Sequence, residues 1–307
     1  MRAEAHVDSV RETRLSNFDG PVPHKRGPKY PQAPKAAHVF NPYWVSAFVG
    51  GRGSGKTYAA ARMLLQYERF GLIDPDTKKP VCQRIVIISP SFDSNPVWTG
   101  LKHLDPADVH EKYSEDTLQD ILDDIKAEKA NTDEYLAKLE LFKAIKKIKH
   151  EDDLTPEMED LLEETDGDVR RLHKPRYTAR CVVFLILDDL VGSGAYDNKS
   201  KNLLTSVTLK NRHSGICVAF LVQNMKAVPK SIRVNISLWF LFSFANKRSV
   251  LDDLYIEVSR LVTEQQFERL YAHATADDHG FLLVDLGSGV PKPQRFRAGF
   301  DRFLTLS

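Results

Sequence analysis

The chain has 307 residues, of which 42% are apolar and 28% are charged, a composition typical of a globular protein with one large domain or two small ones. Its first residues, MRAEAHVDSVRE, are too polar for a signal peptide, and the longest apolar run, at 238–245, is far shorter than the about 18 residues of a membrane span. The cysteines, Cys82, Cys181 and Cys217, lack metal-ligand spacing and the even count of a disulfide framework, which predicts buried thiols in a reducing compartment.

Charge is distributed unevenly along the chain. The whole sequence sums to +1, but residues 101–175 hold 22 Asp or Glu against 12 Lys or Arg, which is a net charge of −10. The remaining residues therefore sum to +11. Residues 201–250 hold eight Lys or Arg and no acid, a bias that fits contact with a polyanion, although basic residues on a solvated surface give the same pattern.

Residues 1–40 combine five prolines with several lysines and arginines and contain few apolar side chains. Such a segment cannot bury enough apolar surface to fold by itself, so we predict a basic, flexible arm. Residues 41–307 are predicted to form one domain.

From residue 44 onward the sequence contains short apolar runs that predict buried strands. The runs are continuous rather than alternating, which suits strands covered on both faces, and segments with helical periodicity lie between them. This order predicts an α/β fold with a mostly parallel central sheet flanked by helices. The predicted strands are 44–49, 84–89, 182–187, 216–222 and 237–242, and the pair of a helix at 263–274 and a strand at 281–286 completes the domain.

The first strand runs into GGRGSGKT, the phosphate-binding loop of P-loop NTPases, and a helix is predicted at 56–70. Glycines let several backbone N–H groups converge on phosphate oxygens, and the following helix directs its positive end at them. We predict that Lys56 reaches the β and γ phosphates of ATP and that Thr57 binds Mg²⁺. The predicted nucleotide-binding residues are Gly50, Gly51, Arg52, Gly53, Ser54, Gly55, Lys56 and Thr57.

More than 90 residues separate the second and third predicted strands, whereas a complete βαβ unit needs only about 30. We therefore predict a helical, acidic insertion at about 100–175. One of its helices is expected to start near Asn131 or Thr132, because Asn131 and Glu134 have capping-box spacing. A second is expected to start at Thr155-Pro156. The insertion is assigned to subunit or partner contacts, with a solvated helical decoration as the alternative.

The strand FLILDD, at 184–189, ends in two acids. In a parallel sheet these carboxylates emerge at the same edge as the phosphate loop. Asp188 is predicted to bind Mg²⁺ through water. Asp189 is predicted to activate the attacking water, while a supporting role in the metal shell is the alternative.

The segment KNRHSGICVAFLVQN, at 210–224, contains a strand between an Arg-His pair and a polar end. Gln223 is expected beside Asp188, where it can sense the γ phosphate or the water. Arg212 is expected at the opposite edge, which suits an arginine finger that acts on a neighbouring subunit's nucleotide. Arg233 is the second candidate for that finger, structural salt bridges are the alternative for both, and His213 is expected to have a packing role.

Together these motifs resemble the viral DNA-packaging ATPases of the FtsK and HerA superfamily, specifically the poxvirus-type enzymes of large DNA viruses. The resemblance spans about residues 38–305. It rests on Asn41-Pro42, on GGRGSGKT, on ILDDL at 186–190, and on the ordered series NRHSG, LVQN and SIRVNIS. The tail segments GFLLVDL at 280–286 and FRAGFDRF at 296–303 add to it.

The resemblance implies an ATPase that moves double-stranded DNA, independently of its sequence, into a preformed capsid. It also implies a homo-oligomeric ring of five or six subunits, with capsid vertex or portal proteins as partners, in the host cytoplasm, the viral factory or the virion. By position, Lys56, Thr57 and Asp188 serve nucleotide and metal, Asp189 the water, Gln223 the sensor, and Arg212 the neighbouring site. The long insertion departs from the compact members of this family.

Two other functions fit a P-loop. A small-substrate kinase shares the loop but normally carries a lid whose arginines act within one subunit. A nucleotide-dependent assembly or capsid-vertex protein would use ATP to fix a conformation, with slow turnover that DNA does not affect. Paired acids with Gln223 favour hydrolysis over this last alternative.

Overall fold

The structure is a computed structural model that describes residues 30–33, 40–150, 153–196, 202–244, 248–287 and 289–305. The predicted arm at 1–40 lies outside these residues except at 30–33 and 40, where Gln32 forms a bridge with Ile73 and Phe40 is buried. Among the described residues, no helix is both long and apolar enough to cross a lipid bilayer.

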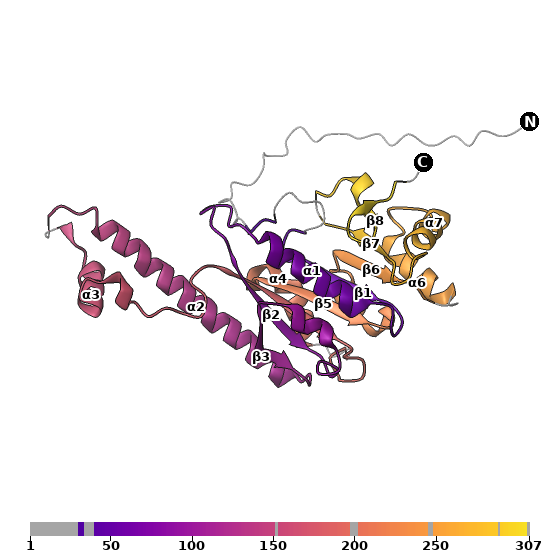
Figure 1. Cartoon of the computed structure of the whole chain (residues 1–307), viewed down its shortest axis with the longest axis horizontal. Helices are drawn as coiled ribbons and strands as arrows, with labels where there is room; N and C mark the ends of the chain where they lie inside the picture. The colour runs from indigo at the N-terminus through magenta and orange to yellow at the C-terminus, as the bar shows by residue number, and fades with distance from the viewer. Residues whose placement is uncertain are drawn as a thin grey trace, which may run out of the picture.

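A single nine-stranded sheet forms the centre of the molecule, in the order β3-β2-β4-β5-β1-β6-β7-β8-β9 (Figure 1). Strands β1 to β6 are mutually parallel, and β7, β8 and β9 are antiparallel additions at one side. The predicted fold class is therefore confirmed. The strands are β1 Val45–Val49, β2 Cys82–Ile88, β3 Leu104–His110, β4 Cys181–Asp188, β5 Ile216–Val222, β6 Leu238–Phe242, β7 Phe281–Asp285, β8 Phe296–Ala298 and β9 Arg302–Phe303.

Helices cover both faces of the sheet. One face packs against α1, whose small and apolar side chains fill a core with the inner side chains of β1, β4 and β6. The other face packs against α4, α6, α7 and the first part of α2. The helices are α1 Lys56–Phe70, α2 Glu115–Ile145, α3 Pro156–Thr165, α4 Leu203–Ser214, α5 Lys230–Arg233, α6 Arg248–Val258 and α7 Glu264–Ala274.

Buried apolar runs in the sequence correspond to strands, because every residue of β1, β5, β6 and β7 is buried. The predicted helix at 56–70 coincides with α1, and Thr263 caps α7 through a complete capping box with Gln266. The predicted start at Thr155-Pro156 is also confirmed, as the N-cap and first residue of α3.

The predicted helix start near Asn131 or Thr132 is wrong. Helix α2 begins 16 residues earlier, at Glu115, where the Ser114 side chain accepts a hydrogen bond from the Thr117 N–H at 2.9 Å. Asn131 lies inside this 31-residue helix. A capping-box pattern inside a helix is ineffective because the N–H groups there already bond to carbonyls of the preceding turn.

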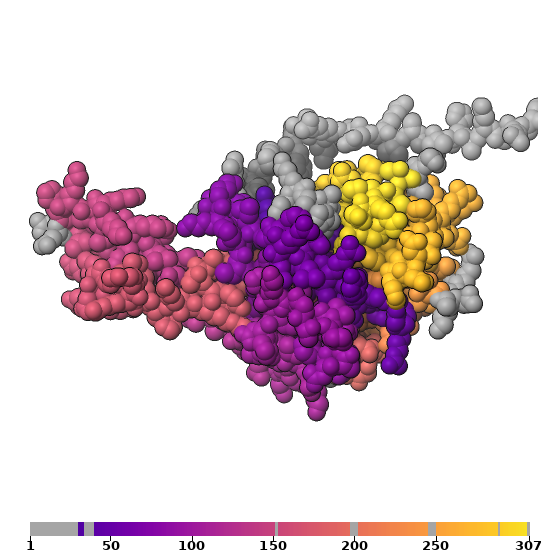
Figure 2. Space-filling model, viewed as in Figure 1, coloured from indigo at the N-terminus to yellow at the C-terminus, as the bar shows by residue number. Residues whose placement is uncertain are grey.

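The predicted insertion at about 100–175 starts too early. Residues 104–110 form β3, which pairs with β2 at the edge of the sheet, and Leu118, Ile121 and Ile125 of α2 belong to the main core. Only the remainder, at 132–150 and 153–175, stands away from the domain; we call it the helical projection (Figure 2). Its own small core contains Phe142, Leu161 and Leu172.

Candidate nucleotide site

The glycine-rich loop connects the carboxyl end of β1 to the start of α1. Gly53 and Gly55 have left-handed backbones, with φ of 75° and 97°, a conformation that glycine adopts without steric cost. A Cβ atom at Gly50 would lie 2.6 Å from both the Cβ of Phe242 and the Oγ of Ser54. The loop therefore depends on glycine both for its turns and for close packing against β6.

Lys56 lies at the first position of α1 and folds back over the loop. Its Nζ donates to the carbonyl oxygens of Gly50 and Gly51, each at 2.9 Å. Burial lowers the pKa of Lys56, while the charges of Asp188 and Asp189 oppose this change. The amine thus lies against the loop backbone and within the electrostatic influence of two carboxylates.

Asp188 ends β4 and is 4% exposed. It accepts a hydrogen bond from the Ser89 hydroxyl at 3.4 Å, and the Thr57 hydroxyl also bonds to it. Burial raises the pKa of Asp188 to about 6 and Asp189 adds to the rise, whereas Lys56 and the two hydroxyls oppose it. A buried carboxyl group whose pKa is raised in this way is a candidate functional residue.

Asp189 and Gln223 meet because they follow β4 and β5, which are adjacent and parallel in the sheet. Asp189 follows β4 with a left-handed backbone, φ 53°, and its N–H donates to the carbonyl of Leu221 at 3.3 Å. Its Oδ1 accepts a hydrogen bond from Gln223 Nε2 at 3.2 Å, and both side chains are exposed. Asp189 thus combines a strained backbone with a hydrogen bond from Gln223, and its charge opposes the fall in the pKa of Lys56 that burial causes.

Thr57 and Asp188 fit Mg²⁺ by their chemistry. Magnesium prefers hard oxygen ligands and is bound in nucleotide sites by one or two protein groups together with phosphate oxygens and water. In the described part of the chain, no group of three or more His, Cys, Asp or Glu side chains is placed to hold a metal ion. The ion would therefore depend on the nucleotide for its remaining ligands.

Arg212 lies far from these groups, in the last turn of α4, next to the amino end of β5. It is exposed and lines two cavities at the amino edge of the sheet, opposite to the loop. Arg233, in α5, pairs with Glu257 of α6, with 3.2 Å between Nε and Oε1. Of the two candidate fingers, Arg212 extends from the surface and Arg233 contacts its own subunit.

Two residues that sequence motifs did not single out also belong to this edge. Ser89 follows β2 and holds Asp188. His279 has a left-handed backbone, φ 61°, and its Cβ would lie 3.1 Å from a Cβ placed on Gly55. The only local signal for His279 is the turn sequence ADDHG at 276–280, which does not reveal that the turn contacts the loop.

Comparison with known families bears on the same residues. The family model of the poxvirus A32 protein matches residues 142–270. The chain is similar to the poxvirus A32 protein. The matched range includes Asp188, Asp189, Arg212 and Gln223, so the resemblance to poxvirus-type proteins inferred from the motifs is confirmed. No curated protein matches the chain.

Several solved structures are similar in fold to this chain. The genome-packaging NTPase B204 from Sulfolobus turreted icosahedral virus 2, in complex with AMP, shares 12% identity with a TM-score of 0.45, covering 84% of this chain and 98% of its own. B204 from Sulfolobus turreted icosahedral virus shares 13% identity with a TM-score of 0.43, covering 82% and 96%. ATPases 2 and 3 of EssC from Geobacillus thermodenitrificans share 12% identity with a TM-score of 0.38, covering 76% and 46%.

Proposed function

We propose that this chain is an ATPase that moves double-stranded viral DNA into a preformed capsid, in a homo-oligomeric ring of five or six subunits. The observation that carries the proposal is the convergence of Lys56, Asp188, Asp189 and Gln223 around the phosphate loop at one edge of the sheet. The similarity to the poxvirus A32 protein supports the viral assignment. The proposed location is the host cytoplasm, the viral factory or the virion, and the proposed partners are capsid vertex or portal proteins.

The proposed roles of the site residues in ATP hydrolysis follow from their positions. Backbone N–H groups of the loop and the Lys56 amine bind the phosphates and neutralise charge that develops on the γ phosphate. Thr57 and Asp188 would hold Mg²⁺, which would supply further charge neutralisation. The Asp189 carboxylate orients the attacking water and accepts its proton, and Gln223 fixes the rotamer of Asp189 through the 3.2 Å hydrogen bond.

The proposed completion of this site by Arg212 of a neighbouring subunit is supported by its place at the opposite edge of the sheet. Head-to-tail contact in a ring would bring that edge toward the next subunit's loop. Mixing Arg212→Ala and Lys56→Ala subunits should therefore recover part of the ATPase activity that each lacks alone. A mixture of Lys56→Ala and Asp188→Asn subunits is the control, because both defects lie within the loop-side site and no intact site can form. Absence of recovery in the first mixture would exclude a finger in trans.

Coupling to DNA is tested by the ATPase rate with and without duplex DNA, on protein of known oligomeric size. Duplex DNA of any sequence should stimulate hydrolysis at low salt, and added salt should suppress the stimulation, because phosphate contacts release counterions and carry no base information. Lys56→Ala protein sets the background rate. Intact basal hydrolysis that DNA leaves unchanged at low salt would reject the motor function.

A further inference from the structure

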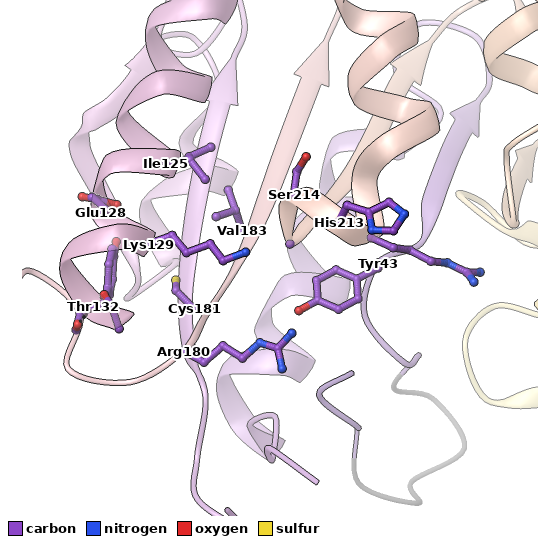
Figure 3. Close-up of a pocket in the computed structure, with 13 residues that line it drawn as sticks. Tyr43, Ile125, Glu128, Lys129, Thr132, Arg180, Cys181, Val183, His213 and Ser214 are labelled. Carbon is purple, nitrogen blue, oxygen red and sulfur yellow. Dashed lines mark hydrogen bonds between the residues drawn. The ribbon is translucent and has the colours of Figure 1, made fainter. Parts of the chain in front are cut away.

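A separate pocket lies at the amino edge of the sheet, away from the phosphate loop (Figure 3). Its cavity volume is about 50 Å³, enough for a group of a few heavy atoms. We call it the Tyr43 pocket. Its lining includes the side chains of Tyr43, Lys129, Arg180, Arg212 and His213.

Tyr43 is held in place by an unusual backbone. Its φ is 69°, a left-handed conformation that is costly for an aromatic residue. Two buried contacts maintain it: the Asn211 amide donates to the Tyr43 carbonyl at 2.8 Å, and the Tyr43 N–H donates to the Cys217 sulfur at 3.0 Å. Because strained residues persist only where the surrounding structure fixes them, they often mark a functional position.

The Tyr43 hydroxyl has no hydrogen-bond partner within the described residues, although the side chain is only 4% exposed. It points into the space between Lys129 and Arg180 (Figure 3). A buried hydroxyl without a partner is unfavourable compared with a phenylalanine of the same shape. The arrangement therefore leaves a hydrogen-bond donor for a group that enters the pocket.

The charge around this hydroxyl is positive. Lys129 comes from α2, Arg180 precedes β4, and Arg212 lies in the last turn of α4. Arg180 also pairs with Asp74, at a long 3.7 Å. Glu128 is the single acid in the described lining, and both of its oxygens already bond to arginines, Oε2 to Arg84 at 2.6 Å and Oε1 to Arg176 at 3.1 Å.

We propose that the Tyr43 pocket binds a terminal phosphate group, either free inorganic phosphate or the end of a nucleotide. A cavity of this size with a donor at its base admits a small oxyanion, whereas a backbone phosphate of duplex DNA carries a sugar on each side and cannot reach a buried hydroxyl. Lys129 and Arg180 neutralise the charge, and the Tyr43 hydroxyl donates to one phosphate oxygen. The pocket lies at the opposite edge of the sheet from the subunit's own phosphate loop, and its lining includes Arg212, the proposed finger for a neighbouring subunit's nucleotide.

Inorganic phosphate and ADP should be titrated separately into Lys56→Ala protein, in which the phosphate loop is weakened. In this background, Tyr43→Phe should lower the affinity for the ligand that uses the pocket by about tenfold or more, as expected for loss of a hydrogen bond to a charged group. Tyr113→Phe is the matched control, because it also removes a buried hydroxyl that has no hydrogen-bond partner among the described residues, but one that lies outside the pocket. It should leave the affinities for phosphate and ADP unchanged.

Equal affinities in Tyr43→Phe and Tyr113→Phe, for both ligands, would overturn the proposal. So would a change in oligomeric size on Tyr43→Phe without a change in phosphate or ADP affinity, because the pocket would then hold a group from another protein. If Tyr43→Phe does not fold, Lys129→Gln replaces it, since this exposed residue can lose its charge without disturbing the core. Lys129→Gln should then lower the same affinity about threefold, and an unchanged affinity rejects the site.

Discussion

The carboxyl edge of the sheet and the helical projection differ in how their residues are supported. Strands at the edge are covered on both faces by large apolar cores, so small shifts of Lys56, Asp188 or Gln223 would disturb many neighbours. The projection depends on a core of three fully buried side chains with a few partly buried ones around them. The sheet is therefore suited to hold side chains at fixed distances from one another. The projection exposes a surface but is less rigidly packed.

Residues with a left-handed backbone conformation also differ between the two regions. In the projection, Asp166 and Gly167 have positive φ because they end α3, where such residues satisfy the last carbonyls of a helix. At the sheet edge, Asp189 and His279 have positive φ beside the phosphate loop without capping a helix. The first pair follows from local helix chemistry, and the second is imposed by the tertiary structure.

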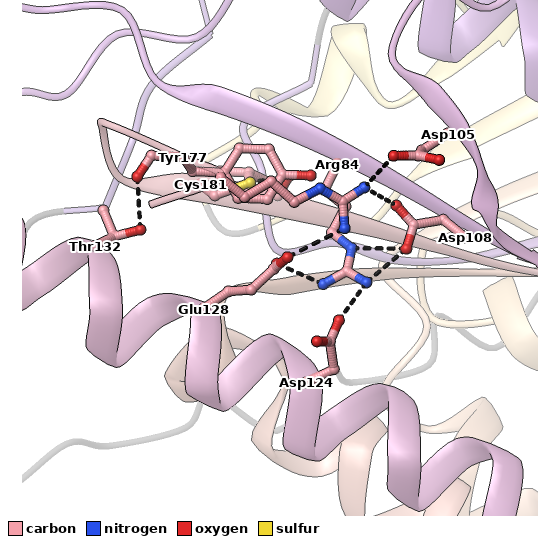
Figure 4. Close-up of polar contacts among 10 residues, drawn as sticks. Arg84, Asp105, Asp108, Asp124, Glu128, Thr132, Tyr177 and Cys181 are labelled. Atoms are coloured by element: carbon pink, nitrogen blue, oxygen red, sulfur yellow. Dashed lines mark hydrogen bonds and ion pairs between the residues drawn. The ribbon is translucent and has the colours of Figure 1, made fainter. Parts of the chain in front are cut away.

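Among the charged residues, the largest expected effect on stability lies where α2, the helix that leads into the projection, meets β2 and β3. Arg84 of β2 is 4% exposed and pairs with Asp108 of β3 and with Asp124 and Glu128 of α2, at 2.5 to 2.6 Å (Figure 4). Arg84→Ala leaves these carboxylates without their main partner, so the free energy of unfolding should fall by about 3 kcal/mol. Urea denaturation followed by circular dichroism measures it.

Lys138→Ala is the control for Arg84→Ala. Lys138 lies in the projection and pairs with Glu134 and Glu164 at the surface, where water screens the charges. Its loss should cost less than about 1 kcal/mol. Similar losses for the two variants would show that the Arg84 ion network does not anchor α2 to the sheet.

At the candidate nucleotide site, a substitution is expected to raise the free energy of unfolding rather than lower it. Because the pKa of Asp188 is raised from 3.8 to about 6, its charged form is disfavoured in the folded protein at neutral pH. Asp188→Asn should therefore stabilise the metal-free protein by roughly 2 kcal/mol while abolishing hydrolysis. Asp189→Asn, at an exposed neighbour, should leave the free energy of unfolding within about 0.5 kcal/mol.

The pH dependence of the free energy of unfolding tests independently whether ionised Asp188 destabilises the folded protein. As the pH falls from about 6 toward 4, folded Asp188 takes up a proton that the unfolded chain does not yet bind, so this residue's destabilising contribution disappears. The stability difference between Asp188→Asn and the unaltered protein, measured with EDTA, should be largest above pH 6 and small at pH 4. A difference independent of pH would contradict a buried charge as its cause.

The smallest effect is expected in the projection. Leu161→Ala removes a side chain that is 3% exposed, but the projection can open while the sheet stays folded. Global unfolding should therefore change by about 1 kcal/mol or less, with faster amide exchange confined to 132–150 and 153–175 and an unchanged basal ATPase rate. Leu187→Ala, in β4, should instead cost about 2–5 kcal/mol globally. Equal global losses would show that the two regions unfold as one unit.

Much of the sheet could be predicted because its strands are continuous apolar runs, as in 216–222 and 237–242, which coincide with or lie within one residue of β5 and β6. Strand β3 could not be predicted, because LDPADVH at 104–110 contains two acids and a proline. It lies at the edge of the sheet, where a strand does not need a continuous run of apolar residues. The start of α2 was misplaced because the capping pattern at Asn131 falls inside the helix, whose first part is fixed by the packing of Leu118 and Ile121 in the main core.

By itself, the sequence determined the phosphate loop, the acids that end β4 and their common edge with Gln223, because adjacent residues and the direction of parallel strands fix those positions. Only the tertiary structure decided that β5 separates β1 from β4, that His279 contacts Gly55, and that Tyr43 meets Lys129 and Arg180 in one pocket. These contacts join segments distant in the chain, and their geometry depends on how helices and strands pack, which local patterns of hydrophobicity and charge do not encode.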